Sequence, residues 1–211
     1  MRLTKFGHSC VRIEHDGAVL VIDPGGYTER AALDGVDAVL ITHEHADHLD
    51  FDALADALGK RPAATVHTHP DVASKLDAVR EAVTAVETGQ SFEAAGLRVK
   101  AFGGIHAEIH PDIPRVANLG YLVADSIYHP GDSFDVPEGA RVETLFVPIS
   151  APWLKISESV DFVRAVAPRR AFALHDAIVN EAGGALLDGV LGRLLHVDYQ
   201  RLAPGTSVDA S

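Results

Sequence analysis

The feature that most constrains this chain is a dense group of histidines between a short apolar strand and a helical pattern. The strand is expected over Ala38 to Ile41, and the string His-x-His-x-Asp-His begins two residues later. Because side chains two apart in an extended backbone point to the same side, His43 and His45 should face one position. Asp47 and His48 lie at the start of the helix and should face a neighbouring position. The spacing therefore predicts two adjacent metal ions at one strand-to-helix turn.

The cysteine count limits which metal sites this chain can build. Cys10 is the only cysteine, so an intramolecular disulfide and a thiolate-based structural zinc site are both excluded. Any metal must be held by imidazole nitrogen and carboxylate oxygen, which suit zinc, manganese or iron. We expect two divalent metal ions, with zinc as the first expectation and manganese or iron as alternatives.

Apolar runs rich in Val, Ile and Leu recur along the sequence and predict strands, with helical patterns between them. The first third is mostly strand, and strand-rich blocks followed by helices occur in both halves of the chain. This order suits two packed sheets with helices outside, a four-layer α/β/β/α sandwich in one domain over residues 1–211. The expected strands are 1–6, 11–14, 18–22, 38–41, 63–66, 97–102, 121–123, 145–149 and 171–174; the expected helices are 51–58, 72–79, 158–166 capped by Ser157 and 181–195 capped by Asn180; residues 206–211 are expected to be irregular.

Several short motifs carry a family resemblance that spans nearly the whole chain. THEHADHLD resembles the signature of the metallo-β-lactamase superfamily. The later motifs match in order, and they are Gly104-Ile105-His106-Ala107, His129-Pro130-Gly131-Asp132 and Leu174-His175-Asp176. Gly7-His8-Ser9-Cys10 and Ile22-Asp23-Pro24 resemble the opening of its L-ascorbate-6-phosphate lactonase-like branch. The resemblance implies the metallo-β-lactamase sandwich and a metal-dependent hydrolase.

The resemblance also implies how the ligands divide between two metal ions. The implied ligands are His43, His45 and His106 for the first metal, Asp47, His48 and His175 for the second, and Asp132 as a bridge between them. In such a site a metal-bridged hydroxide is the nucleophile. Asp47, which would orient that hydroxide, is the expected catalytic residue.

Two positions leave alternatives open. His110 lies in the same loop as His106 and competes with it for the ligand position. We favour His106 because it follows the Gly-Gly break, where a strand end can approach a site closely, and the other histidine is then expected near the rim. Asp23 precedes Pro24 and is either an acceptor for a ligand imidazole or a turn-forming residue.

Four further residues are candidates for contact with the metals or the substrate. His8 lies near the site or is an ordinary hairpin residue, and His129 tunes the site without touching metal. Trp153 and Lys155 either form a substrate wall, with Lys155 supplying a positive charge, or belong to a loop that packs Trp153 on the core. A second His-x-His, at 67–69, is interpreted as part of a loop, since no carboxylate follows it at ligand spacing.

Charge and hydropathy restrict the partners. The formal net charge of -12 disfavours nucleic acids and anionic membranes. We expect no segment that spans a membrane and no signal peptide, and therefore a cytoplasmic protein. The expected partner is a small, anionic substrate attracted by the charge of the metals, and formation of a homo-oligomer is left open.

The leading functional hypothesis is hydrolysis of a small ester, lactone or phosphoester, because the lactonase-like branch carries the resemblance. One alternative is a phosphodiesterase acting on RNA or cyclic nucleotides, although the acidic charge counts against RNA. Another is an iron-based redox member of the superfamily, and His45 counts against the flavodiiron type, where Glu commonly occupies that place. A catalytically silent binding protein is a further alternative, against which the complete ligand set argues.

Overall fold

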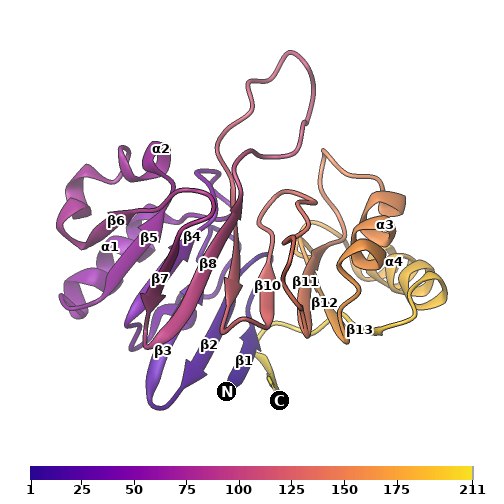
Figure 1. Cartoon of the computed structure of the whole chain (residues 1–211), viewed down its shortest axis with the longest axis horizontal. Helices are drawn as coiled ribbons and strands as arrows, with labels where there is room; N and C mark the ends of the chain where they lie inside the picture. Colours follow the sequence, from indigo (N-terminus) through magenta and orange to yellow (C-terminus); the bar gives the residue numbers. More distant parts are fainter. Residues whose placement is uncertain (211) are drawn as a thin grey trace.

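Two seven-stranded sheets form the centre of the protein in a computed structural model, which describes residues 1–210 (Figure 1). The first sheet has the order β14-β1-β2-β3-β4-β5-β6, with β1 Arg2–Lys5, β2 Val11–His15, β3 Ala18–Ile22, β4 Ala38–Ile41, β5 Thr65–Thr68, β6 Val83–Ala85 and β14 Thr206–Asp209. The second has the order β13-β12-β11-β10-β9-β8-β7, with β7 Ser91–Ala94, β8 Leu97–Gly103, β9 Leu119–Val123, β10 Ile127–His129, β11 Thr144–Pro148, β12 Arg170–Leu174 and β13 Asp198–Gln200.

Each sheet joins an antiparallel part to a parallel part. In the first sheet the pairs from β14 to β3 are antiparallel and those from β3 to β6 are parallel. In the second sheet the pairs from β7 to β10 are antiparallel and those from β10 to β13 are parallel. Loops at the carboxyl ends of parallel strands are the usual place for a ligand site. The expected ligands other than His106 follow β4, β10 and β12, and His106 follows the antiparallel strand β8.

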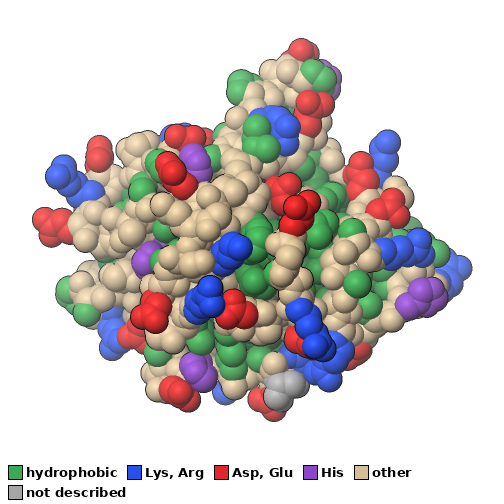
Figure 2. All heavy atoms as spheres, viewed as in Figure 1, with side chains coloured by type: hydrophobic (Ala, Val, Ile, Leu, Met, Phe, Trp, Pro, Cys, Tyr) green, Lys and Arg blue, Asp and Glu red, His purple; other side chains and the backbone are tan. Residues whose placement is uncertain are grey.

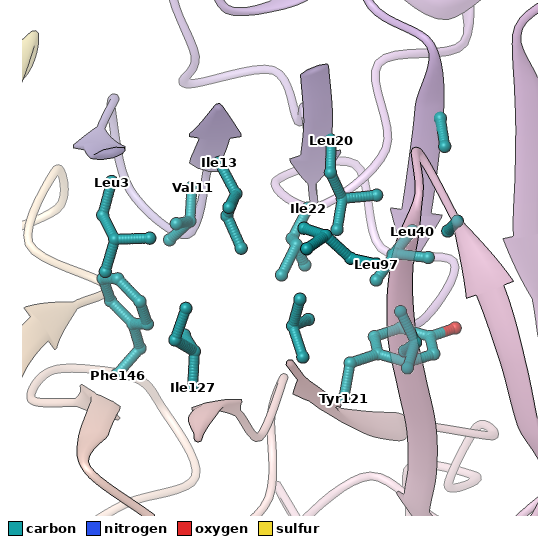
Figure 3. Packing of buried hydrophobic residues seen from close by; sticks show 14 of the residues in the cluster. Leu3, Val11, Ile13, Leu20, Ile22, Leu40, Leu97, Tyr121, Ile127 and Phe146 are labelled. Carbon is teal, nitrogen blue, oxygen red and sulfur yellow. The ribbon is translucent and has the colours of Figure 1, made fainter. Parts of the chain in front are cut away.

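The main hydrophobic core lies between the two sheets (Figure 3). Leu40 from the first sheet and Tyr121 and Phe146 from the second belong to this cluster and are buried. The alternate residues of β4, Val39 and Ile41, pack instead into a second cluster on the outer face of the first sheet. Because both faces of β4 are covered, its sequence is a continuous apolar run rather than an alternating one.

The helices form the outer layers. Helix α1 (Phe51–Lys60) packs in the outer cluster of the first sheet. Helix α2 (Pro70–Ala73) and the 3-10 turns η1 (Arg30–Leu33) and η2 (Asp77–Ala82) contribute side chains to the same cluster. Helices α3 (Ile156–Val166) and α4 (Glu181–Leu194) pack against the second sheet. The expected four-layer α/β/β/α sandwich is confirmed. Within residues 1–210, no helix is long and apolar enough to cross a membrane.

Two predictions about helices are wrong. The helix expected over 72–79 is instead the single turn α2 followed by η2, and Val79 leaves helical geometry with φ -125° and ψ 17°. Val72 and Leu76 are both buried at helical spacing, so the apolar pattern is real although the backbone is not one helix. Helix α3 begins one residue before Ser157, and Lys155 is its N-cap residue.

Two predictions about strands also need correction. The strand expected over 63–66 lies at 65–68, because the turn after α1 continues until the N–H of Ala64 donates to the carbonyl of Arg61. His67 is therefore a buried strand residue rather than a loop residue. The C-terminal segment expected to be irregular contains β14, which pairs with β1; Ser211 lies outside the described residues.

Segment 104–118, between β8 and β9, projects beyond both sheets (Figure 1). In the space-filling view it is a protruding lobe that carries apolar, acidic and basic side chains (Figure 2). Its two limbs are joined by main-chain hydrogen bonds, from Gly104 N–H to the carbonyl of Asn118 and from His106 N–H to the carbonyl of Val116, each 2.9 Å long. This segment brings His106 to the edge where the other expected ligands lie.

Candidate metal centre

The turn between β4 and α1 is held rigidly against the loop that follows β3. Gly26 N–H donates to the carbonyl of Ala46 at 2.7 Å, and the N–H of Asp50 donates to the carbonyl of Pro24 at 2.9 Å. A Cβ at Gly25 would lie 1.9 Å from the carbonyl oxygen of Asp47, so only glycine allows this approach. The side chain of Asp50 then caps α1 by accepting from the N–H of Ala53 at 3.0 Å.

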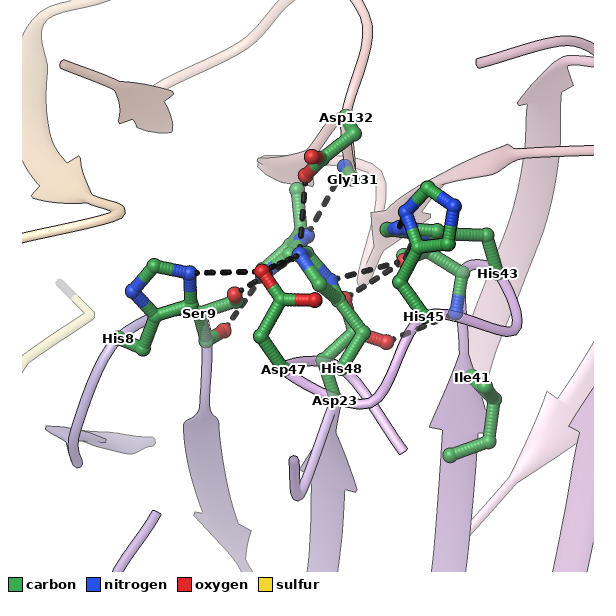
Figure 4. Close-up of polar contacts among 12 residues, drawn as sticks. His8, Ser9, Asp23, Ile41, His43, His45, Asp47, His48, Gly131 and Asp132 are labelled. Atoms are coloured by element: carbon green, nitrogen blue, oxygen red, sulfur yellow. Dashed lines mark hydrogen bonds and ion pairs between the residues drawn. The ribbon is translucent and has the colours of Figure 1, made fainter. Parts of the chain in front are cut away.

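The structure brings the expected histidine ligands and Asp47 together in two adjoining groups. Figure 4 shows His43, His45, Asp47 and His48 from these groups. The groups are His43, His45 and His106, and His8, Asp47, His48 and His175; in each, one ligand-type atom per residue lies within 4.8 Å of the others. A third combination of this kind joins His43 and His48 to Asp132. Figure 4 places Asp132 between the two groups, entering from the other half of the chain.

Asp132 contacts histidines of both groups through different oxygens. Its Oδ1 lies 2.9 Å from Nε2 of His48 and 2.7 Å from Nε2 of His175. Its Oδ2 lies 3.3 Å from Nε2 of His106. A carboxylate with one oxygen toward each group has the placement that a bridging ligand requires.

The outer nitrogens of three histidines are held by hydrogen bonds, which orients the inner nitrogens. Nδ1 of His48 lies 2.7 Å from Oδ2 of Asp23, and Nδ1 of His106 bonds to the carbonyl of Ala107. The hydroxyl of Thr42 donates to Asp23 at 2.7 Å and can therefore accept from Nδ1 of His43 at 3.0 Å. A metal ion at the centre would need the proton of each ring on Nδ1 and the lone pair on Nε2, and these Nδ1 bonds favour that arrangement.

The inner ring nitrogens lie at distances from one another that suit a shared cation better than direct hydrogen bonds. Nε2 of His48 and Nε2 of His175 lie 3.0 Å apart, and Nε2 of His43 lies 3.1 Å from Nδ1 of His45. Nε2 of His106 is buried with no hydrogen-bond partner in the described part of the chain, and the two imidazole nitrogens nearest to Oδ1 of Asp132 are also proposed metal ligands. Buried polar atoms crowded in this way are costly to leave without well-formed partners, whereas a divalent cation would satisfy them.

Burial and neighbouring charge set the ionisation of the ligands. Burial lowers the pKa of His43 well below its usual value and also lowers that of His45, so both favour the neutral form that binds metal. For Asp132, burial opposes ionisation, but the fields of His175 and His48 outweigh it and hold the pKa well below the usual range. His48 is also buried, yet Asp132 and Asp23 raise its pKa well above the ordinary value.

Asp47 is the most exposed carboxylate of the group, with 31% of its side chain accessible. Its Oδ2 lies 3.1 Å from Nε2 of His8, and the His8 ring stacks on that of His175 with 4.3 Å between centroids. Burial opposes ionisation of Asp47, but the bond to His8 and the field of His48 outweigh it and lower the pKa to about 2. His8 therefore lies inside the site and fixes the orientation of an ionised carboxylate.

The structure separates several alternatives that the sequence left open. It places His106 in the site, whereas His110 is exposed in the projecting segment, 3.5 Å from Asp112. Asp23 is fully buried with φ 51°, so it both forms the turn and accepts from Thr42 and His48.

The remaining candidates occupy different places. Nε2 of His129 donates to the carbonyl of Ser9 at 2.8 Å, so this ring links the N-terminal hairpin to the Asp132 turn. The indole N–H of Trp153 donates to Oδ2 of Asp132 at 2.8 Å, so this residue contacts a ligand rather than only the core. Lys155 is exposed at the start of α3, and its main-chain N–H donates to Glu158.

Asn118 is a site residue that the sequence analysis did not identify. Its Oδ1 accepts from the N–H of Asp132 and its Nδ2 donates to the carbonyl of Pro130, each at 2.9 Å. A Cβ at Gly131, where φ is 62°, would lie 2.3 Å from this Oδ1. Asn118 therefore holds the turn that places Asp132 between the two groups of histidines. Its only signal in the sequence is a polar residue directly before a buried strand.

Comparisons with known proteins agree with this geometry. Residues 2–175 match the family model described as the beta-lactamase superfamily domain. Protein Rv0786c of Mycobacterium tuberculosis is 42% identical over 99% of this chain and 99% of its own length. UPF0173 metal-dependent hydrolase MK1542 of Methanopyrus kandleri is 31% identical over 83% of this chain and 84% of its own length.

A solved structure has the same architecture. Igni18, described as a novel metallo hydrolase from Ignicoccus hospitalis, superposes with a TM-score of 0.76 at 21% identity. The match covers 98% of this chain and 97% of that chain. At this level of identity the likeness shows the shared fold.

Proposed function

This chain belongs to the beta-lactamase superfamily, and from that premise we propose that it is a metal-dependent hydrolase of a small, anionic ester, lactone or phosphoester. The observation that carries the proposal is the position of Asp132, whose two oxygens face two groups of imidazole nitrogens. We assign His43, His45 and His106 to the first metal ion and Asp47, His48 and His175 to the second, with zinc first and manganese or iron as alternatives.

Two bound ions would lower the pKa of a shared water toward neutrality and offset negative charge that develops on the substrate. The residues of the chain supply orientation. Asp23 and Thr42 keep the ligand imidazoles in the required tautomer, and Asp47, held by His8, is placed to accept a hydrogen bond from the attacking water. With an ester, the oxygen of water bonds to the acyl carbon, the acyl–oxygen bond breaks, and the alcohol leaves with a proton.

Several features support a small substrate. The chain matches MK1542 over most of both lengths, so it carries no large addition relative to that protein. The net charge of -12 disfavours a polyanion at long range, while the charge of two metal ions would still attract a small anion. The cytoplasm is the compartment we propose, since the single thiol is free and buried.

Metal analysis of two matched variants tests the proposal. We expect wild-type protein purified without chelator to carry close to two transition-metal ions, and chelation to abolish hydrolysis. His106→Ala should lose metal and activity, whereas His110→Ala in the same segment should keep both. Full activity without metal would contradict the proposed function, and the reverse result for the two variants would contradict the ligand assignment.

A substrate panel identifies the reaction. It consists of lactones, phosphorylated lactones, phosphodiesters, thioesters and β-lactams, assayed separately with zinc, manganese and iron. We expect a small anionic member of the panel to be cleaved best. Preferred cleavage of structured RNA, with rates that fall steeply as salt rises, would replace this proposal with a phosphodiesterase.

A further inference from the structure

The side chain of Trp153 lies against both groups of the candidate metal centre. Its indole N–H donates to Oδ2 of Asp132 at 2.8 Å. Its ring meets the rings of His106 and His175 edge to face, with 6.0 Å and 6.3 Å between centroids. His106 belongs to the first group and His175 to the second. One side chain from the loop after β11 therefore contacts the proposed bridge and lies beside both halves of the centre.

The main chain of Asp132 is fixed, but the bonds that fix it do not orient the carboxylate. The N–H of Asp132 donates to Oδ1 of Asn118 at 2.9 Å, and its carbonyl accepts from the N–H of Ala107 at 2.8 Å. Neither bond restricts rotation about the Cβ–Cγ bond. The terminal torsion of an aspartate is broad, so the direction of the two oxygens is set by the groups that the carboxylate contacts.

Trp153 can set this direction without being a metal ligand itself. Within residues 1–210, the other close polar contacts of the carboxylate are Nε2 of His48, His106 and His175, all proposed ligands. Bound metal would occupy the lone pairs of these nitrogens, and the indole N–H would then be the donor that the carboxylate keeps. The side chain of Asp132 is 4% exposed, so water has little access to replace this donor.

The indole is itself held by the core. Its ring packs against Phe134 with 5.1 Å between centroids, and Phe134 packs in turn against Phe162 of α3 at 5.2 Å. At the start of the same loop, the N–H of Ile149 donates to the carbonyl of Leu174 at the end of β12. A donor held in this way keeps its direction before any ion binds, as a residue that orients a metal ligand must.

From these contacts we infer that Trp153 is a positioning residue, whose N–H keeps Oδ2 of Asp132 turned toward the first metal group while Oδ1 faces the second. The inference rests on the proposed two-metal hydrolase and adds a residue to it. Without the N–H, Oδ1 can still face His48 and His175, but within residues 1–210 no group outside the ligand set holds Oδ2 toward His106. Loss of the N–H should therefore weaken metal binding at the first group and leave the second nearly unchanged.

The test removes the N–H and keeps the ring. The sequence contains one tryptophan, so a tryptophan analogue changes this position alone. β-(3-Benzothienyl)alanine, supplied to a tryptophan auxotroph, keeps the shape of the indole and replaces the N–H with sulfur. 5-Fluorotryptophan, incorporated in the same way, keeps the N–H and is the matched control. Zinc is titrated into each metal-free protein in competition with a chromophoric chelator, which gives the two stepwise dissociation constants.

We expect wild type to bind two zinc ions. The benzothienyl protein should bind one ion as tightly as wild type does and the other about 10- to 100-fold more weakly, the usual range for loss of a group that orients a ligand. The 5-fluorotryptophan protein should match wild type. Two variants identify the ion that is affected. In His106→Ala, which lacks a ligand of the first group, the analogue should not change binding of the remaining ion, whereas in His175→Ala it should weaken it.

The outcomes separate this inference from the proposed function. Two ions in wild type and unchanged constants in the benzothienyl protein would overturn the inference and leave the proposed function standing. Equal weakening of both ions would also overturn it, because Trp153 would then support the centre as a whole instead of directing one oxygen. If wild type binds fewer than two ions, the two-metal assignment is wrong and the inference falls with it.

Discussion

A buried ion pair beside the candidate metal centre provides a test of how the fold holds that centre. Nζ of Lys5, at the end of β1, lies 2.9 Å from Oδ1 of Asp176, and the two side chains are 0% and 8% exposed. Asp176 directly follows His175, whose φ is 62° and whose N–H donates to the carbonyl of His8 at 3.2 Å. The pair thus joins the start of the chain to the loop that carries a proposed ligand.

Lys5→Met removes one charge and leaves the other buried. Breaking a buried pair in this way costs about 3–5 kcal/mol, since the remaining carboxylate has lost both its partner and most of its water. For a domain of this size each kcal/mol lowers Tm by about 2–4 °C, so we expect a fall of about 6–20 °C. We also expect weaker binding of metal at the group that contains His175, because the loop loses its anchor.

Two matched variants separate the buried pair from a general charge effect. Arg2→Met removes an exposed cation from the same strand, where Arg2 lies 3.8 Å from Glu14, and such a surface pair contributes about 0–1 kcal/mol. The double variant Lys5→Met/Asp176→Leu replaces both charges with apolar groups and should recover most of the lost stability. Because it restores no charge, its metal affinity shows whether apolar packing alone can hold the loop.

The assays are thermal unfolding of metal-free protein by circular dichroism and titration of cobalt(II) followed by its visible absorption. A Tm for Lys5→Met within about 2 °C of wild type would refute the reasoning, and so would a double variant no more stable than the single one. Lower stability with unchanged cobalt binding would show that the pair supports the fold without positioning His175.

Two other predictions follow from the environment of single side chains. Asp47→Asn should lower turnover at least about 100-fold with little change in KM, because the carboxylate acts on the attacking water. Steady-state kinetics at saturating zinc measure kcat and KM, and an unchanged kcat would exclude this role. Cys10 is fully buried, and burial raises the pKa of its thiol far above the usual value. A disulfide reagent at pH 8 should therefore leave the native thiol unmodified and label one thiol per chain after denaturation; rapid labelling of native protein would contradict this.

The sequence alone determined the features that depend on local patterns. The bounds of β3 and β4 agree with the apolar runs, and Asn180 caps α4 as expected, accepting from the N–H of Gly183. The segment between β4 and α1 concentrates ligand-type residues within a few positions, so its chemistry could be inferred without a fold. Short-range geometry is enough in these cases because the residues that interact are close in the chain.

Only the tertiary structure decided how distant residues meet. The helix expected over 72–79 is broken although its apolar spacing is correct, and the strand expected over 63–66 begins later because a turn intervenes. No local pattern indicates that Asn118 holds the Asp132 turn, or that Lys5 reaches Asp176 across 171 residues. Such contacts depend on strand order and register, which arise from the packing of both sheets.

The cation beside the site is another feature that the sequence alone did not determine. The sequence placed Lys155 among the candidates because it follows a buried strand near Trp153. The structure leaves Lys155 exposed at the start of α3, whereas Arg115, which is also exposed, lines a small hollow with His45 and His106. Arg115 reaches this position because its segment folds back over a ligand to which its Nε is bonded. Spacing and the family resemblance predicted which residues gather at the candidate metal centre, but the path of one long segment decided which charge lies next to them.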